Sequence, residues 1–171
     1  MIREILLPRS EDWIEQATER ARYIMENHES CAQSILAAFM EALEIQNPLL
    51  LRAAGGFHGG MMSSLICGIH TAGLMVLGLL MGRKNLEEGL NGLVPIIQPA
   101  QELMARLNQR LGSHSCKELT GVDFTDLNQA MAFYNISGEN KKCIDRVARG
   151  TREIALFLKE KQESGELFRI G

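Results

Sequence analysis

Apolar residues recur with helical spacing along most of the chain. Near the N-terminus Trp13, Ala17 and Ala21 follow at intervals of four, and near the C-terminus Ile154 and Leu158 do the same. Charged residues occupy the positions between them, which is the pattern of an amphipathic helix with one buried face. No segment shows the period-two alternation that predicts a strand. The pattern therefore predicts an all-α fold.

Residues 61–82 form a long, mostly apolar run without a charged residue, unlike the amphipathic segments. A helix that is apolar on all sides must be surrounded by other helices or by lipid. The run is long enough to span a bilayer. However, Ser63, Ser64, His70 and Thr71 disfavour transfer into hydrocarbon, and no aromatic belt flanks the run. We therefore expect no membrane insertion, and predict a single-domain helical bundle over residues 1–171 around this buried central helix.

Prolines, glycines and capping residues divide the rest of the chain. Helices are expected over residues 31–43 and from Pro48 to about residue 54, and residues 85–92 are expected to form a turn. Pro95 and Pro99 are expected to precede a further helix that ends at Gly112. A short helix from residue 116, another from about residue 125 and a long last helix from about residue 143 complete the prediction.

Composition narrows the class of protein. The chain has 171 residues, of which 46% are hydrophobic, enough for one substantial core. The net charge is −3 with both signs interspersed, so we expect no nucleic-acid partner. The N-terminal residues lack an export signal, which predicts a cytoplasmic protein. Apolar surface on the short helices would remain uncovered in a chain of this size, which predicts a homodimer.

The four cysteines are the strongest candidates for chemistry, because cytoplasmic cysteines seldom form static disulfides. Cys31 and Cys116 each follow a serine of a capping box, and Cys143 follows two lysines at the start of the last helix. A helix N-terminus stabilises thiolate, so a lowered pKa is expected at these positions. Cys67 lies in the middle of the central run, where Gly68 can loosen the helix. The alternative is that all four are small buried hydrophobes.

Histidine is the second candidate ligand type. His70 follows Cys67 by three residues, and His28 precedes Cys31 by three, as in mixed Cys/His metal sites. The chain has no C-x-x-C pair of a zinc finger and no C-x-x-C-H motif, so covalent haem is not expected. Any site must therefore be assembled by tertiary packing.

A glycine-rich loop precedes the central run. It lacks the Lys-Ser/Thr ending of a phosphate-binding loop. Its glycines permit close backbone approach, and its backbone amides and imidazole can face a ligand pocket. The candidate cofactor-binding residues are Gly55, Gly56, His58, Gly59, Gly60 and, after the run begins, Gly68.

The same residues carry a family resemblance. The chain has Cys31, AGGFHGGM at residues 54–61, CGIHTAG at residues 67–73, GSHSCKEL at residues 112–119, and Cys143. In order, spacing and flanking residues this set resembles the C_GCAxxG_C_C family over residues 30–148. The resemblance implies a small helical protein that is redox-active through its four cysteines. A related helical region occurs in split-Soret cytochromes, which implies iron–sulfur or electron-transfer chemistry with a redox partner that the sequence does not name.

The chain departs from the family motif beside Cys67. The alanine of the motif is Ile69 here, and the second small residue is Ala72, followed by Gly73. The larger side chain of Ile69 is expected to enlarge the wall of the pocket near Cys67.

Three functions follow from these observations. The leading hypothesis is an electron-transfer protein in which Cys31, Cys67, Cys116 and Cys143, with His70 as a further candidate ligand, bind an iron–sulfur cluster or another metal. The second is a metal-free thiol–disulfide oxidoreductase that uses the same cysteines for catalysis. The third is a helical binding module in which the cysteines are structural.

Overall fold

The computed structural model describes residues 6–10, 12–135 and 141–167. Within these ranges the fold is all-α, with an isolated β-bridge between Ile66 and Ser115 and no strand. The α-helices are α1 (Trp13–His28), α2 (Cys31–Ala42), α3 (Pro48–Ala53), α4 (Gly68–Met81), α5 (Gly89–Leu111), α6 (Cys116–Thr120), α7 (Leu127–Asn135) and α8 (Lys141–Glu163). Three short turns of other helix types lie between them: η1 (Ala54–Phe57), η2 (Gly60–Ser64) and η3 (Leu86–Glu88). The all-α fold class predicted from the sequence is confirmed.

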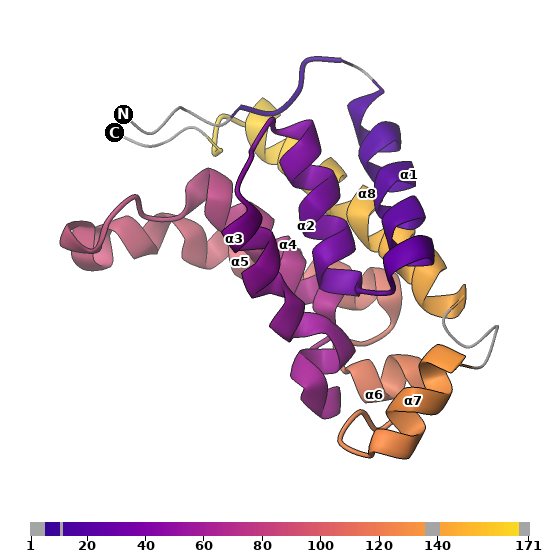
Figure 1. The fold of residues 1–171 in the computed structure, drawn as a ribbon. Helices are drawn as coiled ribbons and strands as arrows, with labels where there is room; N and C mark the ends of the chain where they lie inside the picture. Colours follow the sequence, from indigo (N-terminus) through magenta and orange to yellow (C-terminus); the bar gives the residue numbers. More distant parts are fainter. Residues whose placement is uncertain (1–5, 11, 136–140, 168–171) are drawn as a thin grey trace.

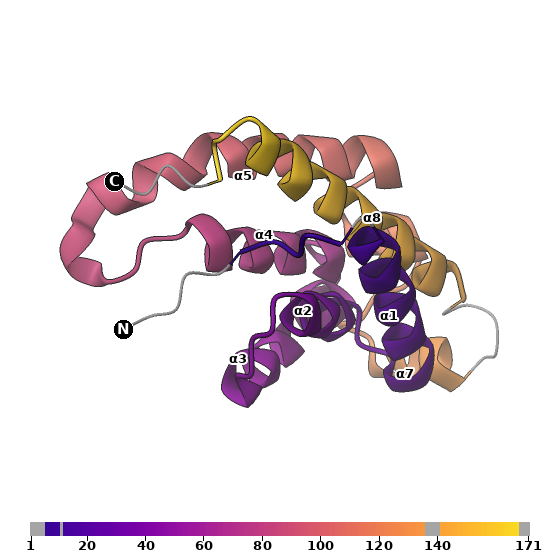
Figure 2. The ribbon, with the colours of Figure 1, turned by 90° about the horizontal axis from the view of Figure 1, so that it is seen from above.

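Helix α4 is the central helix of the bundle. It contacts α2, α5 and α8, and its residues Ile69, Val76 and Leu77 are almost fully buried. Figure 2 shows α5 and α8 along one side of α4 and the pair α1–α2 on another. The hydrophobic core draws on five helices, with contributions from Ala17, Ile35, Val76, Leu107 and Ile154.

Helix α1 attaches the N-terminal part of the chain to the last helix. It packs against both α8 and α2. Its buried stripe includes Ala17 and Ala21, and these small side chains let the neighbouring helices approach closely. Trp13 at its start meets the edge of Phe39 of α2, with ring centroids 6.4 Å apart. The first and last helices therefore belong to the same core.

The central helix is shorter than the uncharged run of residues 61–82. Met61, Met62 and Ser64 have φ angles between 54° and 59°, and Leu65 also departs from helical geometry. Leu65 and Cys67 instead bond to the backbone of residues 114–116. Helix α4 has 14 residues and so spans about 21 Å. Within the described ranges no helix is long and apolar enough to cross a membrane.

Helix α5 begins earlier than the sequence predicts. Pro95 and Pro99 lie inside it, although both were expected to precede it. Proline removes one intrahelical hydrogen bond. For Pro95 the carbonyl left without a partner belongs to the exposed Asn91, where water can solvate it. The first half of α5 together with η3 extends away from the other helices (Figures 1 and 2).

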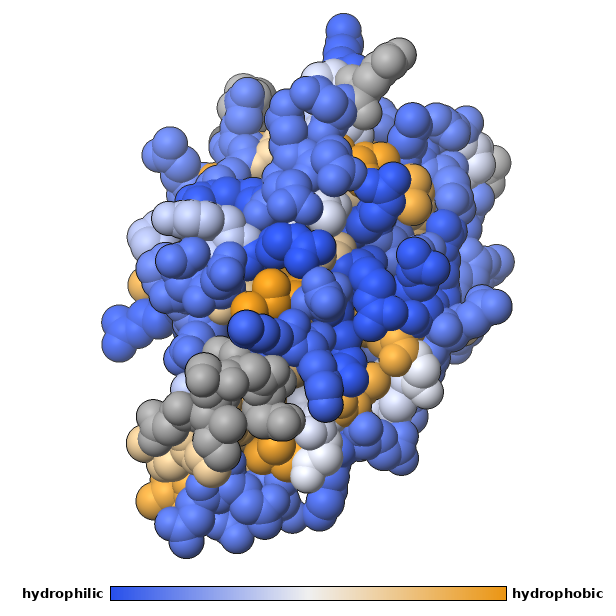
Figure 3. Space-filling view, turned by 90° about the vertical axis from the view of Figure 1, so that its right-hand side faces the viewer, coloured by the Kyte–Doolittle hydropathy of each residue, from blue (hydrophilic) through white to orange (hydrophobic). Residues whose placement is uncertain are grey.

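The opposite side of the molecule is polar. The face seen in Figure 3 is mostly hydrophilic, with separate small apolar patches. Arginine and carboxylate side chains pair across helices on this side, as in Arg22 with Asp145 at 2.8 Å and Arg152 with Glu15 at 2.5 Å. These exposed pairs join α1 to α8 and add little stability each.

Candidate functional site

Each of the four cysteines lies at the start of a helix. Cys31 is the first residue of α2 and Cys116 the first residue of α6, as the capping boxes predicted. Cys143 is the third residue of α8. Cys67 was expected in the middle of a helix, but it is the residue that immediately precedes α4. Four helix starts, from distant parts of the chain, therefore carry the four thiols.

Backbone pairing places Cys67 and Cys116 side by side. The Cys67 amide donates to the His114 carbonyl at 2.8 Å, and the Cys116 amide donates to the Leu65 carbonyl at 2.7 Å. These two bonds form the β-bridge between Ile66 and Ser115. Because the segment before α4 bonds to the segment before α6, both helices begin at the same level.

All four cysteines line one cavity. Its walls also include the aromatic rings of Phe124, Phe133 and Tyr134 and the charged side chains of Glu29 and Arg146. The cavity volume is about 30 Å³, which suits a small ion or one or two water molecules and is far below that of a pocket for an organic ligand. The distant cysteines thus share one small site.

Two glycines allow the chain to close around the sulfurs. A Cβ atom on Gly68 would collide with the Cys31 Sγ, and one on Gly60 would lie 2.7 Å from the Cys116 Cβ. Gly60 and the preceding Gly59 also have φ angles of 63° and 59°, which favour glycine. Gly59 lines the cavity and packs against the ring of Phe124. Gly59, Gly60 and Gly68 therefore shape the site.

The other predicted residues of the glycine-rich loop divide into two groups. His58 lines the cavity; its Nδ1 lies 3.2 Å from the Gly55 carbonyl oxygen, and its ring meets the edge of Tyr134. Gly55 packs against Gln33, and a Cβ on Gly56 would meet no atom within 4 Å. Neither Gly55 nor Gly56 lines the cavity, so the structure does not bring these two glycines to the cysteines, and their contribution to a site stays a prediction.

His70 also lies away from the cavity. It is fully buried, and its Nε2 lies 3.1 Å from the Asn108 Oδ1 of α5. Its place three residues after Cys67 turns the ring toward α5, while Ile69 faces the cavity. In this structure the His70 ring joins α4 to α5 and is not among the residues that line the cavity, so its role as a metal ligand stays a prediction.

The thiols have raised pKa values, contrary to the expectation from helix starts. Burial, with smaller contributions from the nearby Cys143 and Cys116, raises the pKa of Cys31 to about 12. Burial, with a smaller contribution from Cys143, raises the pKa of Cys116 to about 11. The pKa of Cys67 is well above the usual value because of burial and the neighbouring Cys31. Loss of hydration and mutual repulsion therefore outweigh the helix dipole.

Two residues near the sulfurs were missed by the sequence analysis. Arg146 hydrogen-bonds to Cys143, but burial still raises the pKa of that thiol. Burial together with Cys31, Cys116 and Cys143 raises the pKa of Tyr134. The sequence contains one indication that Arg146 lies near the thiols, because Arg146 follows Cys143 by three residues and so shares its side of the helix. The sequence contains no comparable indication for Tyr134.

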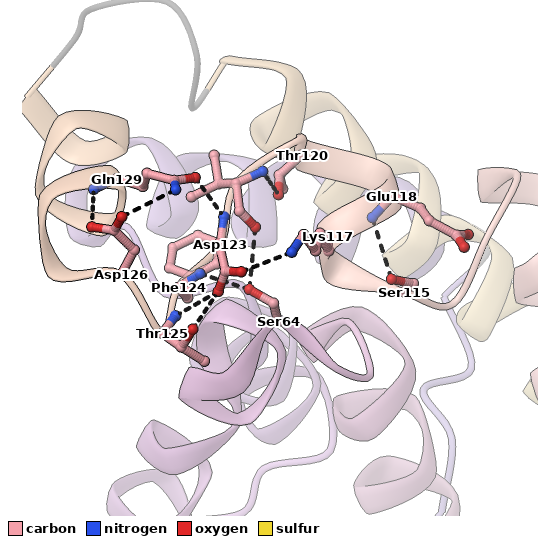
Figure 4. A network of polar contacts seen from close by, with 11 residues as sticks. Ser64, Ser115, Lys117, Glu118, Thr120, Asp123, Phe124, Thr125, Asp126 and Gln129 are labelled. Carbon is pink, nitrogen blue, oxygen red and sulfur yellow. Dashed lines mark hydrogen bonds and ion pairs between the residues drawn. The ribbon is translucent and has the colours of Figure 1, made fainter.

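A network of polar contacts fixes the aromatic wall. The Ser64 hydroxyl accepts from the Phe124 amide at 2.6 Å and donates to the Val122 carbonyl at 3.1 Å. Lys117 pairs with Asp123 at 2.7 Å (Figure 4). These bonds hold residues 122–124 against η2, so that Phe124 packs on Gly59 at the cavity.

Four cysteines line one largely apolar cavity, and this donor type suits a soft metal or an iron–sulfur cluster. The volume of about 30 Å³ matches a single ion, so a cluster requires the cavity to widen. Across residues 6–10, 12–135 and 141–167, no three Cys, His, Asp or Glu side chains lie in metal-ligating geometry. Binding by the four sulfurs therefore requires their side chains to turn from the positions described above.

Comparison with protein families gives a match. The family model described as "Putative redox-active protein (C_GCAxxG_C_C)" matches residues 29–155, about three quarters of the chain. The matched region runs from α2 into α8 and contains all four cysteines. Comparison with curated proteins and with solved structures yields no match.

Proposed function

The chain belongs to the C_GCAxxG_C_C family of redox-active proteins, and we propose that its four cysteines act as one site that binds an iron–sulfur cluster or another metal for electron transfer. The observation that supports this proposal is the shared cavity of Cys31, Cys67, Cys116 and Cys143. Four thiolates are the usual ligand set of iron–sulfur clusters.

The electrostatics of the cavity favour a cationic occupant. The four thiols resist ionisation in the metal-free protein because of burial and because their charges would repel one another. A bound cation removes both costs, since it replaces the lost hydration and lies between the negative sulfurs. Binding would therefore release protons from the cysteines.

The chain supplies the surroundings of the sulfurs. Backbone amides of Ala32 and Gly59 donate to the Cys31 sulfur, and the amide of Ile69 donates to that of Cys67. Such bonds stabilise a thiolate ligand and tune the reduction potential of the group it holds. The rings of Phe124, Phe133 and Tyr134 exclude water from one side. The bound group, for its part, would accept and donate one electron.

The first experiment asks whether the four cysteines act together. We expect anaerobically purified protein to contain metal, with sulfide if a cluster is bound, and to show charge-transfer absorption in the visible region. Each of the four Cys→Ser variants should lose more than tenfold in occupancy, because each sulfur is a ligand. Met131→Ser is the matched control, since it removes an exposed sulfur outside the cavity. Full occupancy in any one cysteine variant would contradict the single four-ligand site.

The second candidate is a metal-free thiol–disulfide oxidoreductase. It is favoured by the absence of a converged ligand set within the described residues and by the electrostatic coupling of Cys31 to its three neighbours. In that reaction two thiols form a disulfide and pass two electrons and two protons to an oxidised partner. Trapping of a mixed disulfide by one Cys→Ser variant, in protein without metal, would select this function. If neither metal nor reversible oxidation is found, the helical binding module remains.

A further inference from the structure

Arg146 is a cationic residue in the wall of the cavity that the four cysteines line. It lies on α8 one turn after Cys143, lines the cavity, and hydrogen-bonds to the Cys143 sulfur. Its charge also acts on Cys116, where it favours the thiolate. One guanidinium group thus acts on two of the four sulfurs.

The guanidinium retains an unused donor. Arg146 Nη1 is buried and has no hydrogen-bond partner among the described residues. Arginine keeps its charge in proteins. A buried N–H of a charged group without an acceptor is unfavourable, so such a donor commonly belongs to a site that gains its acceptor in another state. The anionic form of the cysteine site would provide that acceptor.

We infer that Arg146 is the positioning residue that sets the charge and the reduction potential of the four-cysteine site. This inference rests on the proposed function. When the site takes up an electron, its negative charge increases within a cavity that is largely apolar. A fixed positive charge and N–H donors beside the sulfurs stabilise the reduced state more than the oxidised state. Arg146 therefore raises the reduction potential.

The variants Arg146→Gln and Arg146→Lys separate charge from packing. Glutamine removes the charge, whereas lysine keeps it on a side chain of similar length. Arg149→Gln is the matched control, because Arg149 lies on the same helix and is exposed. Metal and sulfide are measured in all four proteins, and the midpoint potential of the site is measured by spectroelectrochemical titration. We expect a more negative potential in Arg146→Gln, a potential nearer to wild type in Arg146→Lys, and no change in Arg149→Gln.

The outcomes test the inference separately from the proposed function. A wild-type potential in folded, loaded Arg146→Gln would overturn the inference and leave the proposed function standing. If Arg146→Gln loses the bound group, retention in Arg146→Lys supports the role of charge, and equal loss in both variants overturns it. If the wild-type protein binds no metal, the proposed function fails. The potential of the cysteine thiol–disulfide couple is then compared at alkaline pH, where the reduced cysteines carry thiolate that Arg146 can stabilise. A more negative value in Arg146→Gln supports the inference, and an unchanged value overturns it.

Discussion

At the scale of single residues, burial decides the chemistry of the thiols. The sequence correctly predicted that Cys31 and Cys116 begin helices, and a helix start alone lowers a thiol pKa. The sequence could not show that these starts face the same apolar cavity, where neighbouring sulfurs oppose ionisation. The effect of the helix dipole on a thiol can be predicted from the position of the cysteine in the sequence. The desolvation of that thiol depends on the tertiary fold.

The raised pKa values predict slow alkylation of the metal-free protein. With a pKa of about 11, Cys116 at pH 7 holds roughly a hundredfold less thiolate than a thiol at the ordinary value of 9.0. We expect iodoacetamide to modify Cys31 and Cys116 at least that much more slowly in the folded protein than in denaturant, as followed by mass spectrometry of the peptides. Similar rates in the two states would show that the cavity does not protect these thiols.

Gly68 should be intolerant of a side chain. A methyl group there collides with the Cys31 Sγ and lies 3.1 Å from the Phe57 carbonyl oxygen. We expect Gly68→Ala to reduce the free energy of unfolding by about 1–3 kcal/mol, as overpacking does, in urea titrations. The control is Gly78→Ala in the same helix, where a Cβ meets no atom within 4 Å. That control should gain about 0.5–1 kcal/mol through helix propensity, and a loss in both variants would contradict the steric explanation.

At the scale of elements, the periodic helices were predictable and the irregular connections were not. The stripes of α1 and α8 follow directly from the sequence. The uncharged run predicts one helix, because hydropathy alone does not distinguish an apolar turn from an apolar helix. Its first residues leave helical geometry to bond with the segment before α6, a contact between residues about 50 positions apart. The prolines of α5 predict a later helix start for a different reason: an exposed helix tolerates an unpaired carbonyl, because water can solvate it.

Ile69 and Gly150 pack α4 against α8. A Cβ on Gly150 would collide with the Ile69 Cγ2, so the side chain that departs from the family motif faces a glycine. We expect Gly150→Ala to destabilise the wild-type protein but to cost much less in an Ile69→Ala background. The coupling free energy from a double-mutant cycle should be about 1–3 kcal/mol. Gly78→Ala in the same backgrounds is the control and should show no coupling. Additive effects of Ile69→Ala and Gly150→Ala would contradict the contact.

His70 makes the contact between α4 and α5 sensitive to acid. Burial lowers its pKa from 6.5 to about 4, against the opposing effect of Asn108. The unfolded state therefore binds the proton more tightly, and stability falls as the pH drops below 6.5. We expect His70 to account for a loss of about 3 kcal/mol by pH 4.

Urea titrations across this pH range provide the measurement. The loss should be smaller in His70→Gln and unchanged in His28→Gln, which alters an exposed histidine. A direct NMR titration of the His70 ring that gives a pKa near 6.5 would contradict the burial argument.

At the scale of the whole molecule, the exposed apolar surface of the α5 arm, residues 86–97, indicates a protein–protein interface. It carries five exposed large apolar side chains, namely Leu86, Leu90, Leu93, Val94 and Ile97. Contiguous apolar surface of this kind usually marks an interface. In an isologous dimer the same surface of both copies meets, so two arms can cover each other's apolar side chains.

We accordingly predict a homodimer formed through the α5 arm. Light scattering after size exclusion should give twice the chain mass, and the double variant Leu90→Lys/Val94→Lys should give a monomer, because two charges would be buried at the interface. The control is Leu127→Lys, at a leucine of α7 that is 74% exposed. A monomeric wild-type protein at micromolar concentration would contradict the dimer.

The four helix starts that meet at the cavity also have a topological consequence. The cysteines are separated by roughly 30 to 50 residues along the chain. Any group held by all four closes the chain into three successive loops, and each closure of this length removes denatured-state entropy worth about 3–4 kcal/mol in the chain-entropy treatment of cross-links. Losing the group reopens all three loops at once, so occupancy of the site would be linked to unfolding of the chain from α2 to α8.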